Sequence, residues 1–291
     1  MPAMHKAHWH PVSFAAAAAA APPQIDFCLP NFMAGTVGVV AAPAGIGKTS
    51  LLMQLGAAVA AGIAVAGDLL PAPAVAGKVV FLATEDPAPV LQRRAHFFVR
   101  SLRAQGLGDE VVARLESNFQ FLSIAGTPPK ILGDASIGTH SLDELQALAY
   151  GSRLLILDPI RRFHTCDEQN FGKMLLLFDL LADMAAQTGC AILFSHHVEQ
   201  ALHADALREI EGAQGSSAFI NATRWVVNMN GMSSEDAQRF GITPQQRREH
   251  VRVAFTKSNY GSPVPPRWLK RSEHFEGIFE TCDPVALPHP K

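Results

Sequence analysis

The sequence predicts an α/β protein with a mostly parallel central sheet and helices on both of its faces. Two observations support this fold class. Short apolar runs alternate with helical patterns from about residue 31 onward, and a glycine-rich turn joins one run to the helix that follows it. Alternation of this kind is typical of parallel sheets that are buried on both sides. Hydrophobic residues make up 48% of the 291 residues, which is ample for such a core.

Each element of this fold has its own signal in the apolar pattern. The expected strands are Thr36–Ala41, Lys78–Thr84, Phe119–Ile124, Arg153–Asp158, Ala191–His197, Arg224–Asn228 and His250–Lys257. The expected helices are Thr49–Ala61, Pro87–Gln105, Leu142–Ala149 and Phe171–Gln187. The segments Val264–Arg271 and Phe275–Glu280 are expected to close the sheet as a hairpin.

The chain divides into three expected regions. They are a flexible arm over residues 1–30, one α/β domain over residues 31–283 and a tail over residues 284–291. The arm carries the alanine run Ala15–Ala21 behind Lys6, and this leaves a signal peptide as an alternative. Pro22 and Pro23 follow at once, which favours a low-complexity arm.

Charge and cysteine content narrow the class of protein. The net charge of −2 gives no general basic surface, so a nucleic acid would have to bind in a local groove or in the pore of an assembly. None of the four cysteines lies in a C-x-x-C pair, and a reducing cytoplasm is therefore expected. No apolar stretch is long enough to cross a membrane.

A phosphate-binding turn is expected before the first helix. Residues 42–50 read Ala-Pro-Ala-Gly-Ile-Gly-Lys-Thr-Ser, the P-loop pattern G-x-x-x-x-G-K-[ST] with Ala42 in place of the first glycine. Gly45 and Gly47 let backbone N–H groups approach a polyphosphate, and the helix N-terminus adds the positive end of its dipole. The residues expected at the nucleotide are Ala44, Gly45, Ile46, Gly47, Lys48, Thr49 and Ser50.

Lys48 and Thr49 carry the chemistry of this turn. The Lys48 ammonium would reach the β- and γ-phosphates of ATP, and the Thr49 hydroxyl would ligate Mg²⁺. The alternative is a chance glycine-rich turn. The strand before the turn and the helix after it disfavour that alternative.

The run Arg153–Asp158 supplies the second half of a nucleotide site. Its apolar residues form a buried strand that ends in Asp158, and ligands of parallel sheets bind at the carboxyl ends of the strands. We therefore expect Asp158 to hold Mg²⁺, usually through water. Pro159 follows it, so the base that activates water must come from elsewhere.

Glu85 is the candidate for that base. It follows the strand Lys78–Thr84, which we expect to lie beside the strand of the P-loop. A carboxylate there can orient and deprotonate the attacking water. In the structural alternative, Thr84 or Asp86 caps the next helix and the acids stabilise its first turn. The two roles are compatible.

Two histidines, His196 and His197, end another expected strand. One of them would touch the γ-phosphate and report its loss to the following loop. Successive strand side chains point to opposite faces, so only one of the two can face the nucleotide. The alternation disfavours a metal site that uses both, and a plain hydrogen-bonded histidine is the other alternative.

Arg224 at a strand start and Lys257 at a strand end are two further candidates. Each is either an ordinary surface cation or a cation supplied to the ATP of a neighbouring subunit, where it would stabilise charge on the γ-phosphate. Spacing along the sequence does not separate the two interpretations.

Together these residues resemble the RecA/DnaB class of P-loop ATPases, in which the catalytic glutamate follows the second strand. Over most of its length the chain is more specifically similar to the RepA-type hexameric replicative helicases of small broad-host-range plasmids. The blocks that carry this resemblance are Leu29-Pro30-Asn31, Ala34–Gly38, Glu85-Asp86-Pro87, Leu157-Asp158, Arg161–His164, His196-His197, Gly215–Ser217, Arg224-Trp225 and Lys257–Gly261.

The resemblance implies a RecA-like fold and a hexameric ring of identical subunits that hydrolyses ATP with Mg²⁺ and unwinds DNA with 5′→3′ polarity. Single-stranded DNA and the initiator and primase proteins of a plasmid would be its partners. The implied roles are water-activating base for Glu85, metal binding for Asp158, γ-phosphate sensing for His196 or His197, arginine finger for Arg224 and adenine stacking for Arg94. The N-terminal arm would dock on the adjacent subunit.

One segment departs from this resemblance. Residues 198–216 would line the pore of the ring, where cations should meet the DNA backbone. Residues 198–211 instead carry four acidic residues and one arginine, Arg208. This composition favours a regulatory or scaffold ATPase that acts on a protein partner. A third alternative, a nucleotide-gated DNA-binding module with negligible turnover, is disfavoured by the intact Lys48, Glu85 and Asp158.

Overall fold

A nine-stranded sheet organises the chain, in the order β11-β10-β9-β8-β3-β7-β6-β4-β5. It is seen in a computed structural model that describes residues 11–133, 136–198 and 222–286. The strands are β3 (Val37–Ala42), β4 (Val79–Ala83), β5 (Phe119–Ser123), β6 (Leu154–Asp158), β7 (Ala191–His197), β8 (Trp225–Gly231), β9 (His250–Ser258), β10 (Arg267–Arg271) and β11 (Phe279–Cys282). From β8 to β5 the sheet is parallel, and β9, β10 and β11 extend it antiparallel. The predicted mostly parallel sheet is confirmed.

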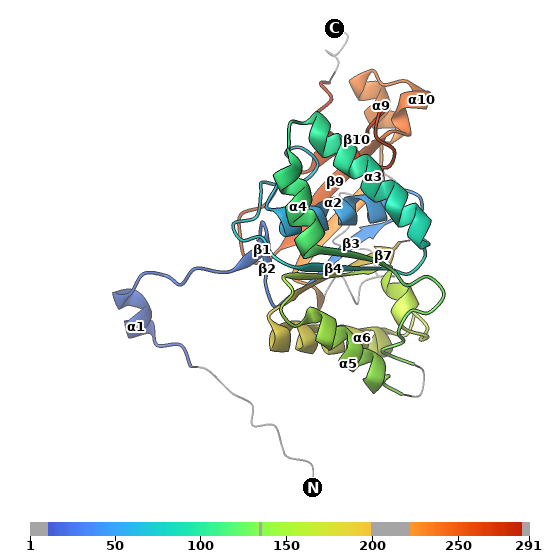
Figure 1. The fold of residues 1–291 in the computed structure, drawn as a ribbon. Coiled ribbons are helices and arrows are strands. Elements are labelled where there is room, and N and C mark those ends of the chain that lie inside the picture. Colours follow the sequence, from blue (N-terminus) through green and yellow to red (C-terminus); the bar gives the residue numbers. More distant parts are fainter. Residues whose placement is uncertain (1–10, 134–135, 199–221, 287–291) are drawn as a thin grey trace.

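Helices cover both faces of the sheet (Figure 1). One face carries α2 (Lys48–Ala61), α3 (Ala88–Ala104) and α4 (Asp109–Asn118), and the other carries α5 (Thr139–Ala149) and α6 (Phe171–Thr188). The shorter helices are η1 (Ile160–Phe163), α9 (Ser234–Phe240) and α10 (Pro244–Arg247). Within the described ranges, none of the helices combines the length and apolar character needed to span a membrane.

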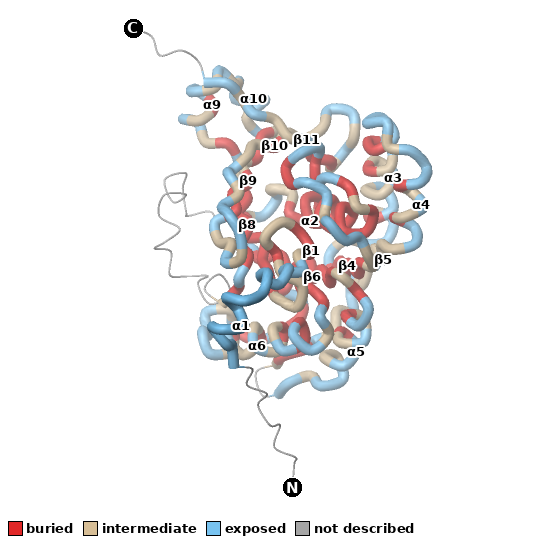
Figure 2. The backbone as a smooth tube through the Cα atoms, turned by 90° about the vertical axis from the view of Figure 1, so that its left-hand side faces the viewer, coloured by how far each residue is buried: buried red, intermediate tan, exposed pale blue. Residues whose placement is uncertain are grey.

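The core has two parts, one on each face of the sheet. Every residue of β3 and nearly every residue of α2 is buried, so the P-loop is built between two elements that are fixed by the core. Figure 2 shows these buried residues running through the middle of the molecule. This burial explains why the apolar pattern of the sequence predicts the fold class.

The place of β4 in the sheet corrects one prediction. The sequence argument places the strand before Glu85 beside the P-loop strand, but β4 pairs with β5 and β6, and β6 and β7 separate it from β3. Strands that come later in the chain are inserted between two that are consecutive, and the local pattern carries no record of that insertion. The carboxyl end of β4 still lies at the same edge of the sheet as the P-loop.

The N-terminal arm is shorter than the predicted residues 1–30. β1 (Phe27–Leu29) pairs with β2 (Phe32–Met33), and Cys28 and Leu29 are buried in the core. Ahead of them, α1 (Phe14–Ala19) is exposed throughout and projects from the domain (Figure 1). The arm therefore ends before residue 27, because apolar side chains from there onward pack on the domain.

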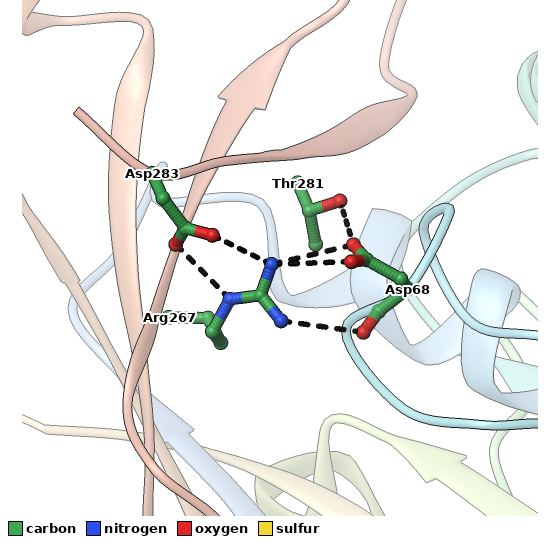
Figure 3. A network of polar contacts seen from close by, with 4 residues as sticks. All are labelled: Asp68, Arg267, Thr281 and Asp283. Carbon is green, nitrogen blue, oxygen red and sulfur yellow. Dashed lines mark hydrogen bonds and ion pairs between the residues drawn. The ribbon is translucent and has the colours of Figure 1, made fainter. Parts of the chain in front are cut away.

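The predicted closing hairpin is present as β10 and β11, and a charged network ties it to the domain (Figure 3). Arg267 on β10 lies 2.7 Å from Oδ2 of Asp283 and 3.3 Å from Oδ2 of Asp68, which belongs to the connection between α2 and β4. Thr281 on β11 donates its hydroxyl to the same Asp68. A network of this kind holds its partners better than an isolated surface pair does.

Candidate nucleotide site

The turn between β3 and α2 has the backbone of a phosphate-binding loop. Gly45 and Gly47 have φ values of 76° and 106°, in the left-handed region that favours glycine. Gly47 also lies against the buried ring of Phe279, where an added Cβ atom would be 2.6 Å from Cζ. Ala42 belongs to β3 and has no positive φ, so its place in the pattern does not require glycine.

Lys48 is held inside this turn. Its Nζ donates to the carbonyl oxygens of Ala42 and Pro43, at 2.8 and 2.9 Å, and lies 3.1 Å from Nδ1 of His197. The helix α2 begins at Lys48 without a side-chain cap, so its first backbone N–H groups are left for a ligand. The ammonium and these N–H groups together suit a polyphosphate.

Two carboxylates act on the Lys48 ammonium. Burial lowers the pKa of Lys48 to about 8, and attraction from Asp158 and Glu85 opposes this shift. Both acids are therefore close enough for their charge to be felt at the P-loop. The structure thus brings together three of the predicted site residues at one edge of the parallel sheet.

Asp158 ends β6 and is buried. Ser195 on the neighbouring β7 donates its hydroxyl to Oδ1 of Asp158. Burial raises the pKa of this carboxyl group, and hydrogen bonds from Ser195 and Thr49 oppose the rise. A carboxylate beside a hydroxyl is an oxygen donor set of the kind that Mg²⁺ uses together with phosphates and water.

The remaining ligands of such an ion would come from nucleotide and solvent. In the parts of the chain that the structure describes, no group of three or more His, Cys, Asp or Glu is placed to hold a metal ion. Mg²⁺ in phosphoryl-transfer sites usually takes one or two protein ligands only. Asp158 and Thr49 therefore fit the predicted Mg²⁺ site.

Glu85 is exposed just beyond the carboxyl end of β4. The capping alternative is not seen, because the Thr84 hydroxyl donates to the carbonyl of Asp158 at 2.9 Å and helix α3 starts without a side-chain cap. Asp86 is paired with Arg94 instead. Among the described residues, none forms a hydrogen bond or ion pair with the Glu85 carboxylate. Its exposure leaves it available to a water molecule at the phosphates.

Arg94 lies against the P-loop helix. Its Nε donates to Oδ2 of Asp86 at 3.1 Å, and its Nη1 donates to Oγ of Ser50 at 3.2 Å. Ser50 follows Thr49 in α2 and is buried. Arg94 is therefore positioned beside the candidate site, and its contact with adenine stays a prediction.

The register of β7 separates the two histidines. His196 lies opposite Ala41 and His197 opposite Ala42 in the pairing with β3. His197 contacts Lys48 and is exposed, whereas His196 is buried and feels the charge of Glu168. Burial lowers the pKa of both imidazoles. His197 is the histidine that faces the P-loop, and the alternation along a strand explains why His196 does not.

Arg224 and Lys257 lie together, but far from the P-loop of their own chain. The Arg224 N–H donates to the carbonyl of Val37 at the start of β3, whereas the P-loop follows the end of that strand at Ala42. Five residues of extended chain span about 16 Å. Burial and the nearby Arg224 lower the pKa of Lys257. This placement excludes a direct role for either cation at the phosphates of the same subunit.

Two residues of the site were missed by the sequence argument. Ser195 is a lone hydroxyl within an apolar strand, and a polar residue inside a buried strand is the signal that could have found it. Arg271 on β10 donates to the carbonyls of Gly45 and Ile46, at 3.2 and 2.8 Å, across 226 and 225 positions of sequence. No short pattern indicates a contact over that separation. The predicted pore loop 198–216, apart from Val198, lies outside the described residues.

The fold and the site define a RecA-like P-loop ATPase. Residues 4–201 match the family model described as an AAA domain, and the chain belongs to that family. The RecA-like fold is also found in two solved structures, one of the ATPase domain of a helicase and one of the RadB recombinase.

The similarity to these structures extends over most of the chain. For the helicase ATPase domain the TM-score is 0.55 with 11% identity, and 85% of each chain is covered. For RadB the TM-score is 0.52 with 14% identity, over 87% of this chain and 93% of that chain. At such low identity the similarity bears on the fold alone.

Proposed function

We propose that this protein is a DNA helicase of the RepA type: a hexameric ring that hydrolyses ATP with Mg²⁺ and translocates on single-stranded DNA during plasmid replication. The observation that carries the proposal is the division of charged groups between two ends of one sheet. Lys48, Asp158 and Glu85 gather at the carboxyl end of the parallel strands, and Arg224 and Lys257 gather at the other end.

This division suits a ring of identical subunits. A head-to-tail interface joins two different surfaces of one chain, so the cations at one end of a subunit can complete the site at the other end of its neighbour. Arg224 would then stabilise the charge on a neighbour's γ-phosphate, with Lys257 beside it. The similarity to a helicase ATPase domain and a recombinase supports the same direction.

The chemistry follows from the placement of the side chains. Lys48 and the N–H groups of the P-loop would hold the β- and γ-phosphates, and Asp158 and Thr49 would hold Mg²⁺. The bound Mg²⁺ would neutralise part of the phosphate charge. Glu85 would accept a proton from water as the water oxygen bonds to the γ-phosphorus and the bond from phosphorus to the β–γ bridging oxygen breaks. ADP and inorganic phosphate then leave, and the proton returns to solvent.

His197 would couple this reaction to movement. It touches Lys48 and is followed directly by Val198, at the start of the segment predicted to meet DNA. Loss of the γ-phosphate changes what Lys48 and His197 contact. That change would pass along β7 into the segment after it.

A second candidate function is that of a regulatory or scaffold ATPase that acts on a protein partner. The acidic composition of residues 198–211 favours it, because like charges repel a DNA backbone. Nucleotide binding and hydrolysis would be the same in both cases. The two functions differ in whether DNA changes the rate of hydrolysis.

The test combines two measurements on the full chain. Light scattering with ATP and Mg²⁺ gives the mass of the assembly, and ATPase rates are compared with and without single-stranded oligonucleotide. We expect a hexamer whose ATPase is stimulated by DNA and which unwinds a forked duplex, with Lys48→Ala as the inactive control. An ATPase that is unchanged by DNA would favour the scaffold function, and no hydrolysis at all would contradict both.

A further inference from the structure

The closing hairpin lies against the outer side of the P-loop. The Arg271 guanidinium on β10 donates from Nη2 to the carbonyl oxygens of Gly45 and Ile46, at 3.2 and 2.8 Å. These are the two residues that precede Gly47 and Lys48. An arginine therefore holds the backbone of the loop from the side that does not face the phosphates.

These bonds determine where the neighbouring N–H groups point. In a planar trans peptide, the carbonyl of one residue and the N–H of the next point in opposite directions. Fixing the carbonyls of Gly45 and Ile46 outward therefore directs the N–H groups of Ile46 and Gly47 inward. N–H groups in this part of a P-loop are the ones that cradle phosphates.

Arg271 is itself held in place by buried groups. Its guanidinium carbon lies 5.1 Å from the centre of the Phe279 ring, and this ring is buried against Gly47. The Gln54 side chain on α2 fixes the Phe279 backbone from both sides, through bonds of 2.9 and 3.0 Å. The contacts thus run in a closed circuit from the P-loop helix to the hairpin and back to the P-loop.

We propose that Arg271 is a positioning residue of the nucleotide site, one that keeps the P-loop in its phosphate-binding shape before nucleotide arrives. The proposal rests on the nucleotide binding that is part of the proposed function, and it does not require DNA unwinding. The planar guanidinium suits the task because one group reaches two carbonyls, which a lysine ammonium on its flexible stem does less well.

The effect of losing Arg271 follows from where it acts. The oriented N–H groups meet the phosphates in the bound state and in the transition state alike, so their disorder weakens binding rather than turnover. The dissociation constant of ADP and the KM for ATP should both rise by about tenfold, the change expected from losing one hydrogen bond to a charged group. The value of kcat at saturating ATP should change by less than about threefold.

The experiment compares Arg271→Ala with Lys270→Ala. Lys270 is the preceding cation on the same strand, and it pairs with Glu273 rather than with the P-loop. ADP binding is measured by isothermal titration calorimetry, ATP turnover by steady-state kinetics, and Tm without nucleotide by calorimetry. We expect weaker ADP binding and a raised KM for Arg271→Ala, parent values for Lys270→Ala, and an intermediate dissociation constant for Arg271→Lys.

The outcomes separate this proposal from the function on which it rests. A parent protein that binds no nucleotide contradicts the proposed function. A parent that binds ADP normally, with Arg271→Ala equally tight or Lys270→Ala equally weakened, contradicts the positioning role alone. A lower Tm for Arg271→Ala with an unchanged dissociation constant makes Arg271 a structural residue and also overturns the proposal. If the alanine variant does not fold, unweakened ADP binding by Arg271→Lys overturns it.

Discussion

The Lys48 ammonium lies 3.1 Å from Nδ1 of His197. An ammonium only donates, so Nδ1 accepts in this contact and the imidazole is neutral there. With the carbonyls of Ala42 and Pro43, His197 completes a set of three acceptors for the three donors of Lys48. A phosphate that binds to Lys48 must displace at least one of them, and this gives His197 a direct way to respond to nucleotide.

The first prediction concerns the pH dependence of ATP binding. The pKa of Lys48 is lowered by burial to about 8, so the free protein loses this charge as the pH rises through that value. Because phosphates bind the charged form, the dissociation constant of ATP should rise above pH 8, by up to about tenfold per pH unit. Calorimetry in buffers of different ionisation enthalpy should also detect proton uptake on binding at pH 9. A dissociation constant that is flat from pH 7 to about 9.5 would exclude the shifted pKa.

The second prediction separates the two histidines. His197→Ala should retain ATP binding and basal hydrolysis but lose the stimulation by DNA, a coupling of roughly 1–3 kcal/mol between sites. His196→Ala should keep that stimulation and instead lower the stability by about 1–3 kcal/mol, because it removes a buried polar group beside Glu168. ATPase titrations with oligonucleotide and thermal melts measure the two effects. Reversal of the two phenotypes would make His196 the sensor.

The site residues that sequence analysis identified correctly have local reasons for their positions. The P-loop and Asp158 each follow a buried strand, and a short apolar run ending in a turn or an acid is visible without any tertiary information. The choice between His196 and His197 needed the register of β7 against β3, which is set by pairing. The place of β4 in the sheet needed the full strand order for the same reason.

Contacts between distant segments lie beyond local patterns. The hydrogen bonds of Arg271 join the last hairpin to a turn 226 positions earlier, and the sequence around Arg271 shows only an ordinary cation. The helix Asp109–Asn118 was missed because it is short and buries only Val111 and Leu115. A helix with two buried apolar residues gives a weak periodic signal.

The third prediction concerns Glu85. Glu85→Gln should bind ATP with parent affinity but hydrolyse it more slowly by about 10² or more, since an amide holds water yet takes no proton from it. Asp86→Asn is the matched control, because the neighbouring carboxylate is paired with Arg94 and should contribute little to turnover. Single-turnover hydrolysis measures the chemical step. If Glu85→Gln hydrolyses ATP at the parent rate, the base must lie elsewhere.

The fourth prediction sets stability against function at Asp158. Burial raises the pKa of Asp158, so at neutral pH the nucleotide-free fold carries the cost of a buried charge. That cost is absent at low pH and grows as the pH rises through the folded-state pKa. Asp158→Asn removes the charge and still accepts the Ser195 hydroxyl, so it should raise Tm in EDTA by roughly 2–4 °C, the shift that 1 kcal/mol gives in a large domain.

The same variant should lose Mg²⁺-dependent hydrolysis, because an amide is a poor ligand for this ion. The gain in Tm over the parent should shrink as the pH falls and Asp158 takes up its proton. Calorimetric melts at pH 7 and pH 5 in EDTA test this sign. A variant less stable than the parent at both pH values would show that the carboxylate stabilises the nucleotide-free fold.

The fifth prediction concerns Arg224, which the sheet places about 16 Å from its own P-loop. Arg224→Ala should assemble and bind ATP normally, while hydrolysis falls by roughly 10³ or more, the range of an arginine finger. Light scattering, nucleotide binding and ATPase rates on the same preparation measure the three properties. A loss of assembly together with activity would point to an interface role instead.

Mixing two inactive variants tests whether Arg224 acts on a neighbour. In a head-to-tail ring, an Arg224→Ala subunit has an intact Glu85, and an adjacent Glu85→Gln subunit can supply the missing arginine. Random mixing at equal amounts should restore about one site in four. Action within one subunit predicts no restored site, because each chain then carries one of the two defects. Energy transfer between labelled subunits must first show that they have exchanged, so that a lack of recovery in exchanged rings contradicts action between subunits.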